Sequence, residues 1–133
     1  MEIECPYCGK LAALVDSSAV YKNSYGMIWL CQPCQAWVGV HKNDGENRPL
    51  GTLANDETRH ARTMAHKRVD PIWQSRHGQG LSKNKVRGSV YAWLAKELGI
   101  DPEDCHIGLF DLKTCVRVIE ICATRQYDDE LVQ

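Results

Sequence analysis

Four cysteines in two closely spaced pairs are the residues of this chain best suited to chemistry. Cys5 and Cys8 form one Cys-x-x-Cys pair, and Cys31 and Cys34 form a second pair after twenty-two intervening residues. Each pair places two thiols on one tight turn, so two such turns can supply a tetrahedral cage of four sulfurs. The long spacer costs only roughly a few tenths of a kcal/mol, because loop-closure entropy grows slowly with length. The pattern therefore predicts one structural Zn2+ ion with no open coordination position.

The remaining cysteine and histidine positions offer weaker alternatives. The chain has seven cysteines, an odd number, and no export signal, which favours thiolates that hold a metal over disulfides. His41 is an alternative ligand, although four well-spaced thiols make it more suited to packing or hydrogen bonding near the loop. Cys105, His106 and Cys115 are the other cluster with metal-binding residue types. Their spacing matches no familiar site, so we expect packing roles, with a second metal site and a thiol nucleophile as the alternatives.

The elements that must position the two cysteine pairs have β-type composition. Residues 11–21 predict two short strands or one interrupted strand, and residues 27–30 and 36–41 run into and out of the second pair. This order of knuckle, strands, knuckle and strand predicts a zinc ribbon in residues 1–48, whose small sheet needs the metal for stability. Structural zinc supplies on the order of 10–16 kcal/mol of apparent binding energy to small domains. Residues 42–49 lack periodicity and predict an exposed loop that ends the ribbon.

Helical signals begin after this loop and continue through residues 49–126. Thr52 or Asn55 can cap a first helix, which should end or bend at Asp70-Pro71, where a second short helix can start. A third helix is expected from Ser82 to Leu98, with Gly99 as its C-terminal residue and Ser89 as an alternative start because Gly88 weakens the middle.

The last part of the chain predicts a short turn, one more helix and a tail. Asp101-Pro102 opens the turn, and Asp111 caps a helix that extends to about Arg125. Residues 127–133 predict a frayed tail. The fold class predicted is therefore α+β: an N-terminal zinc ribbon, a small antiparallel sheet with two knuckles, packed on a C-terminal all-helical part.

Composition and charge limit the class of protein. The 133 residues are 44% hydrophobic and 25% charged, which is typical of a globular protein. No apolar run approaches the roughly 18 residues of a membrane span, and the acidic start differs from a signal peptide. These features predict a cytoplasmic protein.

A net charge of −1 conceals two segments of opposite sign. Residues 97–130 contain nine acids and three bases, a net charge of −6. Residues 59–87, called the basic segment below, contain eight Lys and Arg against Asp70 alone, a net charge of +7. Either the basic segment contacts phosphate, or the two segments pair with each other or are merely solvated. The eight residues are Arg59, Arg62, Lys67, Arg68, Arg76, Lys83, Lys85 and Arg87.

Several motifs together resemble one family. The chain is similar to the zinc-finger-containing (zinc-ribbon) proteins of unknown function found in bacteria, phages and prophages. This resemblance runs from Cys5 to about Cys122. The resemblance implies zinc binding and a mobile-element origin. It also implies that the ribbon and the helical half form one unit, and it assigns no catalytic residue. The motifs are Cys5-Pro6-Tyr7-Cys8-Gly9-Lys10, Ile28-Trp29-Leu30-Cys31-Gln32-Pro33-Cys34, Trp37-Val38-Gly39-Val40-His41, Pro49-Leu50-Gly51-Thr52-Leu53-Ala54 and Cys105-His106-Ile107-Gly108-Leu109-Phe110-Asp111.

Two function classes remain, and catalysis is not expected because the zinc is fully ligated and no familiar catalytic motif occurs. The first is a nucleic-acid-binding protein that uses the ribbon and the basic segment, supplemented by Lys10, Lys42 and Arg48, with weak sequence specificity. Trp29 and Trp37 then either stack on unpaired bases or dock the sheet on the helices. The second is a phage- or prophage-encoded adaptor or inhibitor whose acidic face binds a host protein.

Overall fold

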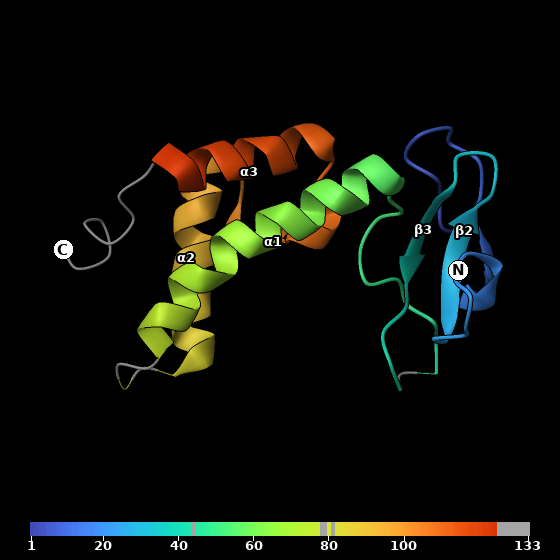
Figure 1. Cartoon of the computed structure of the whole chain (residues 1–133), viewed down its shortest axis with the longest axis horizontal. Helices are drawn as coiled ribbons and strands as arrows, with labels where there is room; N and C mark the ends of the chain where they lie inside the picture. Colours follow the sequence, from blue (N-terminus) through green and yellow to red (C-terminus); the bar gives the residue numbers. More distant parts are fainter. Residues whose placement is uncertain (44, 78–79, 81, 125–133) are drawn as a thin grey trace. The chain divides into compact units, whose positions relative to one another are not determined.

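The computed structural model describes residues 1–43, 45–77, 80 and 82–124, and it has the α+β character expected from the sequence (Figure 1). The chain divides into a ribbon unit, Met1–Arg59, and a helical unit, His60–Gln133. The ribbon unit contains a small antiparallel sheet, and the helical unit contains most of the helical residues. The tail expected at 127–133 lies outside the described residues. None of the described helices is both long and apolar enough to cross a membrane.

Three strands form the sheet of the ribbon unit. Strands β1 (Ala13–Asp16), β2 (Met27–Cys31) and β3 (Ala36–Gly39) pair antiparallel in the order β1-β2-β3. The interruption expected after the first strand is present as a short 3-10 helix, η1 (Ser17–Ala19).

The segment after the sheet differs from the sequence-based domain boundary. Pro49 pairs with Val40, and Ala54 pairs with Trp37 through two backbone hydrogen bonds. Leu53, between these two bridges, is buried in the core of the ribbon unit. The ribbon unit therefore extends to Arg59 instead of ending at residue 48, because residues 49–54 return along β3.

Helix α1 (Asp56–His77) is a single helix, which corrects the break expected at Asp70-Pro71 (Figure 1). Proline inside a helix removes one hydrogen bond and costs about 3 kcal/mol. Pro71 is exposed, whereas Val69 and Trp73 on either side of it are buried in the helical core. Burial of two such side chains is worth about 1.5–3 kcal/mol each, so tertiary packing outweighs the local preference.

The other helix boundaries follow their caps. Helix α2 (Lys83–Leu98) begins after Ser82, whose side chain accepts a hydrogen bond from the Lys85 N–H, and it ends at Gly99 with φ 72°. The alternative start at Ser89 is wrong, because Gly88 lies inside the helix. Two short 3-10 turns follow, η2 (Pro102–Asp104) and η3 (Ile107–Leu109). Helix α3 (Leu112–Thr124) is capped by Asp111, which accepts a hydrogen bond of 2.8 Å from the Thr114 N–H.

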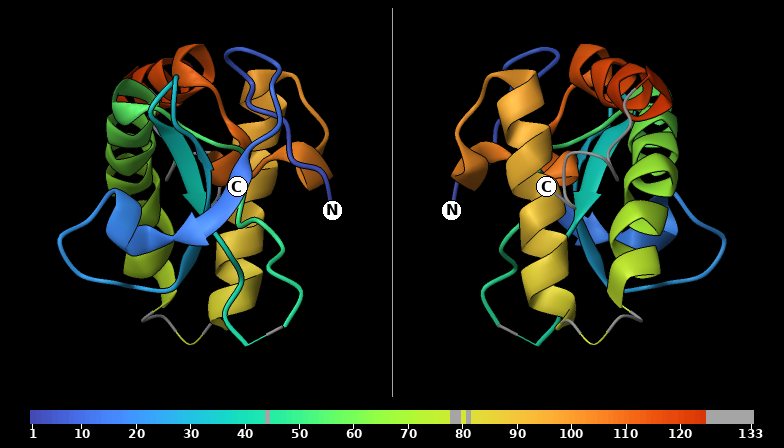
Figure 2. Two further views of the ribbon diagram at one scale, coloured as in Figure 1. Left: turned by 90° about the vertical axis from the view of Figure 1, so that its right-hand side faces the viewer. Right: turned by 90° about the vertical axis from the view of Figure 1, so that its left-hand side faces the viewer.

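Side chains of the three helices form one apolar core in the helical unit. The ribbons of these helices are seen from two sides in Figure 2. Val69 and Trp73 enter this core from α1, Val90 and Leu94 from α2, and Val118 from α3. On α3, Cys115, Val118 and Ile121 are buried, whereas Val116 is exposed.

Candidate metal centre and nucleic-acid interface

The first knuckle is a tight hairpin that presents two sulfurs. The N–H of Cys5 donates to the Lys10 carbonyl at 2.8 Å, and the N–H of Gly9 donates to the Cys5 carbonyl at 2.8 Å. Gly9 adopts φ 77°, a left-handed conformation that favours glycine. The chain therefore reverses directly after Cys8 and keeps both thiols on the same side of the turn.

The second knuckle repeats this geometry at the junction of β2 and β3. Cys31 is the last residue of β2, and Cys34 precedes Gln35, which also adopts a left-handed conformation with φ 49°. The Gln35 backbone N–H and its side-chain amide both donate to the Gln32 carbonyl, at 3.1 and 2.7 Å. Sheet pairing and a tight turn thus position this pair of thiols.

The two knuckles bring all four predicted ligands together. The sulfur atoms of Cys5, Cys8, Cys31 and Cys34 lie within 4.8 Å of one another, and the Cys8 and Cys31 sulfurs are 3.7 Å apart. A tetrahedral zinc ion with Zn–S bonds of about 2.3 Å requires sulfurs separated by about 3.8 Å. The donor set therefore fits one structural zinc ion, and four protein ligands complete its coordination.

The electrostatics of the cluster also favour a cation. The backbone N–H of Lys10 lowers the pKa of the Cys8 thiol, whereas the hydrogen bond with Cys8 raises the pKa of Cys34 to about 12. The four crowded thiols therefore cannot all ionise easily on their own. A divalent cation resolves this conflict, because its binding releases protons and attracts every thiolate.

The alternative ligands do not join this site. In the part of the chain that the structure describes, the four cysteines form the one group of three or more potential metal ligands, and His41 is exposed outside it. Cys105 and Cys115 are buried in the helical core, and burial raises the pKa of Cys105 to about 11. Cys105 therefore remains a protonated thiol at neutral pH, whereas the neighbouring His106 is exposed.

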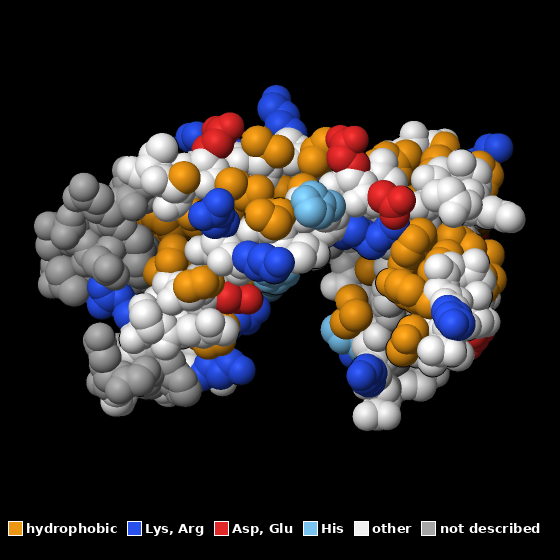
Figure 3. All heavy atoms as spheres, viewed as in Figure 1, with side chains coloured by type: hydrophobic (Ala, Val, Ile, Leu, Met, Phe, Trp, Pro, Cys, Tyr) orange, Lys and Arg blue, Asp and Glu red, His pale blue; other side chains and the backbone are white. Residues whose placement is uncertain are grey.

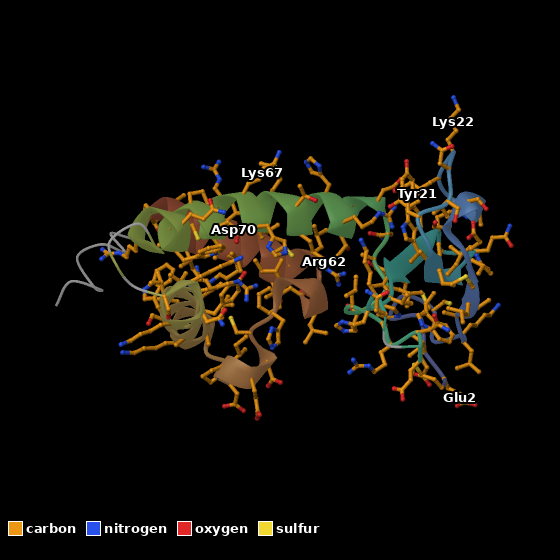
Figure 4. All side chains as sticks on the ribbon, turned by 90° about the horizontal axis from the view of Figure 1, so that it is seen from below. Glu2, Tyr21, Lys22, Arg62, Lys67 and Asp70 are labelled. Atoms are coloured by element: carbon orange, nitrogen blue, oxygen red, sulfur yellow. The ribbon has the colours of Figure 1, made fainter. Side chains whose placement is uncertain are left out.

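Residues of the basic segment fall into two groups, partly buried arginines and exposed cations. Arg59 stacks over Trp37 and hydrogen-bonds the Ala54 carbonyl and the Asp56 carboxylate. Arg62 donates to the Phe110 carbonyl at 2.9 Å and lies on a different side of α1 from Lys67 (Figure 4).

Arg76 belongs with these partly buried arginines. Lys83 is exposed but lies 5.5 Å from the centre of the Trp73 ring. On the face drawn in Figure 3, basic side chains stand singly among acidic and apolar ones. The exposed members of the basic segment are Lys67, Arg68, Lys83, Lys85 and Arg87.

An aromatic cluster on the ribbon was not identified from the sequence as a unit. Tyr21 makes edge-to-face contacts with Tyr25 and Trp37, at ring separations of 5.6 and 6.0 Å. Tyr25 is 70% exposed and Tyr21 is 45% exposed, and Arg59 covers one side of Trp37. Both tyrosines lie in or beside a turn with no periodic pattern, so the sequence carries no signal of their proximity.

The two tryptophans considered for stacking have different environments. Trp29 is only 8% exposed and belongs to the core of the ribbon unit, where its indole N–H donates to the Asn47 carbonyl at 2.8 Å. Trp37 is partly exposed beneath Arg59. Trp29 is therefore too buried to stack on a base, whereas the rings of Tyr21 and Tyr25 are exposed.

Comparison with known proteins is informative at the level of the family. A family model described as a zinc-finger-containing domain matches residues 1–125, which includes both knuckles and all three helices. The chain matches no curated protein and no solved structure.

Proposed function

The chain belongs to the family of zinc-finger-containing domains, and from that premise we propose that it binds nucleic acid without catalysing a reaction. The contacts are dominated by the phosphate backbone and have weak sequence specificity. The zinc ion contributes by holding the ribbon in shape, since four cysteine ligands leave no coordination position for water or substrate.

The exposed aromatic cluster of the ribbon carries this proposal. Tyr21 and Tyr25 present aromatic rings to solvent beside Trp37, and the Arg59 guanidinium lies 3.3 Å from the centre of the Trp37 ring. An aromatic side chain that stacks on an unpaired base contributes about 1–3 kcal/mol, and it accepts any base. Lys22, next to Tyr21, projects outward from the ribbon and adds a cation to this surface (Figure 4).

The exposed cations of the basic segment supply the remaining contacts. Lys67, Arg68 and Lys85 are exposed on α1 and α2, where they can reach phosphate oxygens. Each phosphate neutralised releases condensed counterions, so the affinity falls as salt rises. Scattered cations of this kind support a small number of phosphate contacts, and hence moderate affinity.

Fluorescence anisotropy tests the proposal. The zinc-loaded full chain is titrated against labelled single-stranded DNA, double-stranded DNA and RNA at two salt concentrations. We expect binding at low salt that weakens at high salt, with single strands preferred because their bases are free to stack. Absence of binding to all three nucleic acids at low salt would show that the proposal is wrong.

Charge variants locate the contacts. Replacing Lys67, Arg68 and Lys85 by Gln should lower the slope of log affinity against log salt by roughly 2 to 3 for three lost phosphate contacts. The matched control replaces three exposed cations outside the basic segment, Lys96, Lys113 and Arg117, by Gln. Equal losses in both variants would indicate non-specific attraction instead of a defined surface.

A groove on the helical unit favours a second candidate, binding of a protein partner with a basic surface. The groove has a volume of about 560 Å³, and its floor is largely apolar, although Lys113, Arg117 and Glu120 are also among the residues that line it. The exposed turn that follows Ile100 in the sequence is acidic and contains Asp101 and Asp104. An apolar groove beside negative charge suits a partner with an apolar anchor and basic neighbours.

Nuclease treatment distinguishes the two candidates. A partner protein that remains bound to the immobilised chain after nuclease treatment, and is lost with the variant Val116→Glu, would support the protein-binding function. A partner that disappears with nuclease treatment would support nucleic-acid binding.

A further inference from the structure

The helical unit contains a cavity that zinc binding does not use and that shares only Arg87 with the cations of the basic segment. Its volume is about 360 Å³, within the size range of small-molecule sites, and it opens between α1, α2 and the turns η2 and η3. Polar side chains from all three regions line it: His66 from α1, Asn84, Arg87 and Tyr91 from α2, and His106 from the turns.

The hydroxyl of Tyr91 is the first observation that points to a ligand. The Tyr91 hydroxyl is buried and makes no hydrogen bond of normal distance and angle with the residues that the structure describes, although the Arg87 side chain lies close enough to interact with it. Burial also raises the pKa of Tyr91, so the hydroxyl keeps its proton and can donate to a ligand. Leaving a buried donor without a partner destabilises a protein, so such a group indicates that another molecule completes its hydrogen bonding.

A glycine on the wall of the cavity provides a second, independent observation. Gly88 lies inside α2, where glycine destabilises a helix relative to alanine. A Cβ atom at this position would have no heavy atom within 4 Å, so no neighbouring group requires the side chain to be missing. Gly88 lines the cavity, and a larger residue there would project into it. The missing side chain therefore keeps the cavity open.

The charges around the cavity select the ligand. The guanidinium of Arg87 lies 4.9 Å from the centre of the Tyr91 ring, and none of the lining side chains is a carboxylate. Asp70 is the acid close enough to affect Tyr91, and its carboxylate accepts a hydrogen bond from the Trp73 indole instead. We propose that this cavity binds a small phosphorylated molecule, with Arg87 paired to the phosphate and Asn84 and Tyr91 as hydrogen-bond donors. Ala92, Pro102 and Ile107 provide apolar contacts for its organic part.

Titration of the isotopically labelled full chain, followed by NMR, tests this proposal. Inorganic phosphate and ribose 5-phosphate at millimolar concentrations should shift the amide signals of Gly88 and Gly108, which both line the cavity, whereas ribose should not. Arg87→Met should weaken binding about tenfold or more, because it removes a charge-assisted hydrogen bond. Lys96→Met, which changes an exposed cation on the same helix outside the cavity, should weaken binding less than about twofold.

Filling the cavity gives a test that does not depend on charge. Gly88→Leu should abolish the shift of the Gly108 amide, whereas Ser89→Leu, one residue further along α2 and outside the lining, should leave it unchanged. Circular dichroism confirms that both variants are folded, and Gly88→Ala replaces Gly88→Leu if the larger side chain disturbs the helix. The proposal is wrong if neither phosphate probe shifts these amides, or if Arg87→Met and Lys96→Met weaken binding equally.

Discussion

The ribbon unit and the helical unit bury their side chains by different means. The core of the ribbon unit contains five buried residues, and two of them, Cys5 and Cys31, are zinc ligands. The core of the helical unit contains fifteen buried residues from all three helices and the turns. A core as small as that of the ribbon supplies little hydrophobic stabilisation, so the metal has to provide the rest.

Cysteine illustrates this difference most directly. In the ribbon unit, four thiols meet on two turns and act as metal ligands. In the helical unit, Cys105 and Cys115 are separated from one another in the sequence and buried among apolar side chains, where free cysteine behaves as a small hydrophobic residue. The same residue type is therefore functional in one unit and a packing element in the other, and the local geometry decides which.

Removal of one ligand should produce the largest difference between the units. Cys31→Ser deletes one of four ligands, so the ribbon unit should lose most of the roughly 10–16 kcal/mol that structural zinc supplies. Native mass spectrometry should show one zinc ion in the original chain and none in the variant. Hydrogen exchange should show loss of protection in β2 and β3 while α2 stays protected.

Cys122→Ser is the matched control for this experiment, because Cys122 lies on α3 outside the metal cluster. It should retain one zinc ion and a protected ribbon. If Cys31→Ser still binds one zinc ion, or if α2 loses protection together with the strands, the proposed division between metal-held and packing-held units fails.

A substitution that removes a buried side chain from the helical core should destabilise the helical unit and leave the ribbon unit with its zinc ion. Leu94 is fully buried on α2, and Leu94→Ala should destabilise the helical unit by about 2–5 kcal/mol without changing the zinc content. Chemical denaturation followed by far-ultraviolet circular dichroism measures the loss, and mass spectrometry measures the zinc. A variant that loses zinc as well would show that the two units do not depend on separate sources of stability.

Local features of the fold could be predicted from the sequence. The zinc ligands follow from the Cys-x-x-Cys spacing, and the ends of α2 follow from Ser82 and Gly99, because each signal lies within a few residues of the structure it specifies. The helix end expected at Pro71 was wrong for a different reason, namely that it depends on contacts between distant segments. Burial of residues on either side depends on contacts with α2 and α3, which a local pattern does not contain.

Features formed by distant segments could not be predicted in the same way. Residues 49–54 pair with β3 across a loop that has no strand pattern of its own. The Tyr21–Tyr25–Trp37 cluster requires the register of the sheet, and the cavity beside Gly88 requires three separate segments to meet. Of the candidate sites, the metal ligands could therefore be predicted from the sequence, whereas the aromatic cluster and the cavity become visible only in the tertiary structure.

The cap of α3 provides a smaller, pH-dependent test within the helical unit. Hydrogen bonds from the Thr114 side chain and backbone N–H lower the pKa of Asp111. Its contribution to stability is therefore present above the unfolded-state pKa of about 3.9 and is lost as the pH falls through the folded-state value. Asp111→Ala should lower the free energy of unfolding by about 1 kcal/mol at neutral pH. Below the folded-state pKa of Asp111 it should lower it by almost nothing.

Thermal unfolding of the original chain and the variant between neutral and acidic pH measures this effect. Asp111→Asn is the informative second variant, because an asparagine cap does not titrate in this range and should remove the pH dependence while keeping most of the stability. A difference in stability between the original chain and Asp111→Ala that stays constant across the pH range would contradict the role assigned to the carboxylate.

The residue after the second cysteine differs between the two knuckles, and this difference should produce the smallest effect. Gly9 and Gln35 both follow the second cysteine of their pair and both adopt positive φ, at 77° and 49°. A non-glycine residue in this conformation carries a strain of about 1 kcal/mol, which the hydrogen bond from the Gln35 side chain to the Gln32 carbonyl partly offsets. Gln35→Gly should therefore stabilise the metal-bound ribbon by about 0.5 kcal/mol or less.

Competition with a zinc chelator measures this effect, because metal binding and folding of the ribbon are coupled. Gly9→Ala is the reciprocal variant. Its Cβ would meet no atom within 4 Å, so its cost of about 1 kcal/mol would come from backbone strain alone and would lower zinc affinity about fivefold. If Gly9→Ala left the affinity unchanged, the left-handed turn would not be part of what holds the sulfurs, and sheet pairing alone would have to position them.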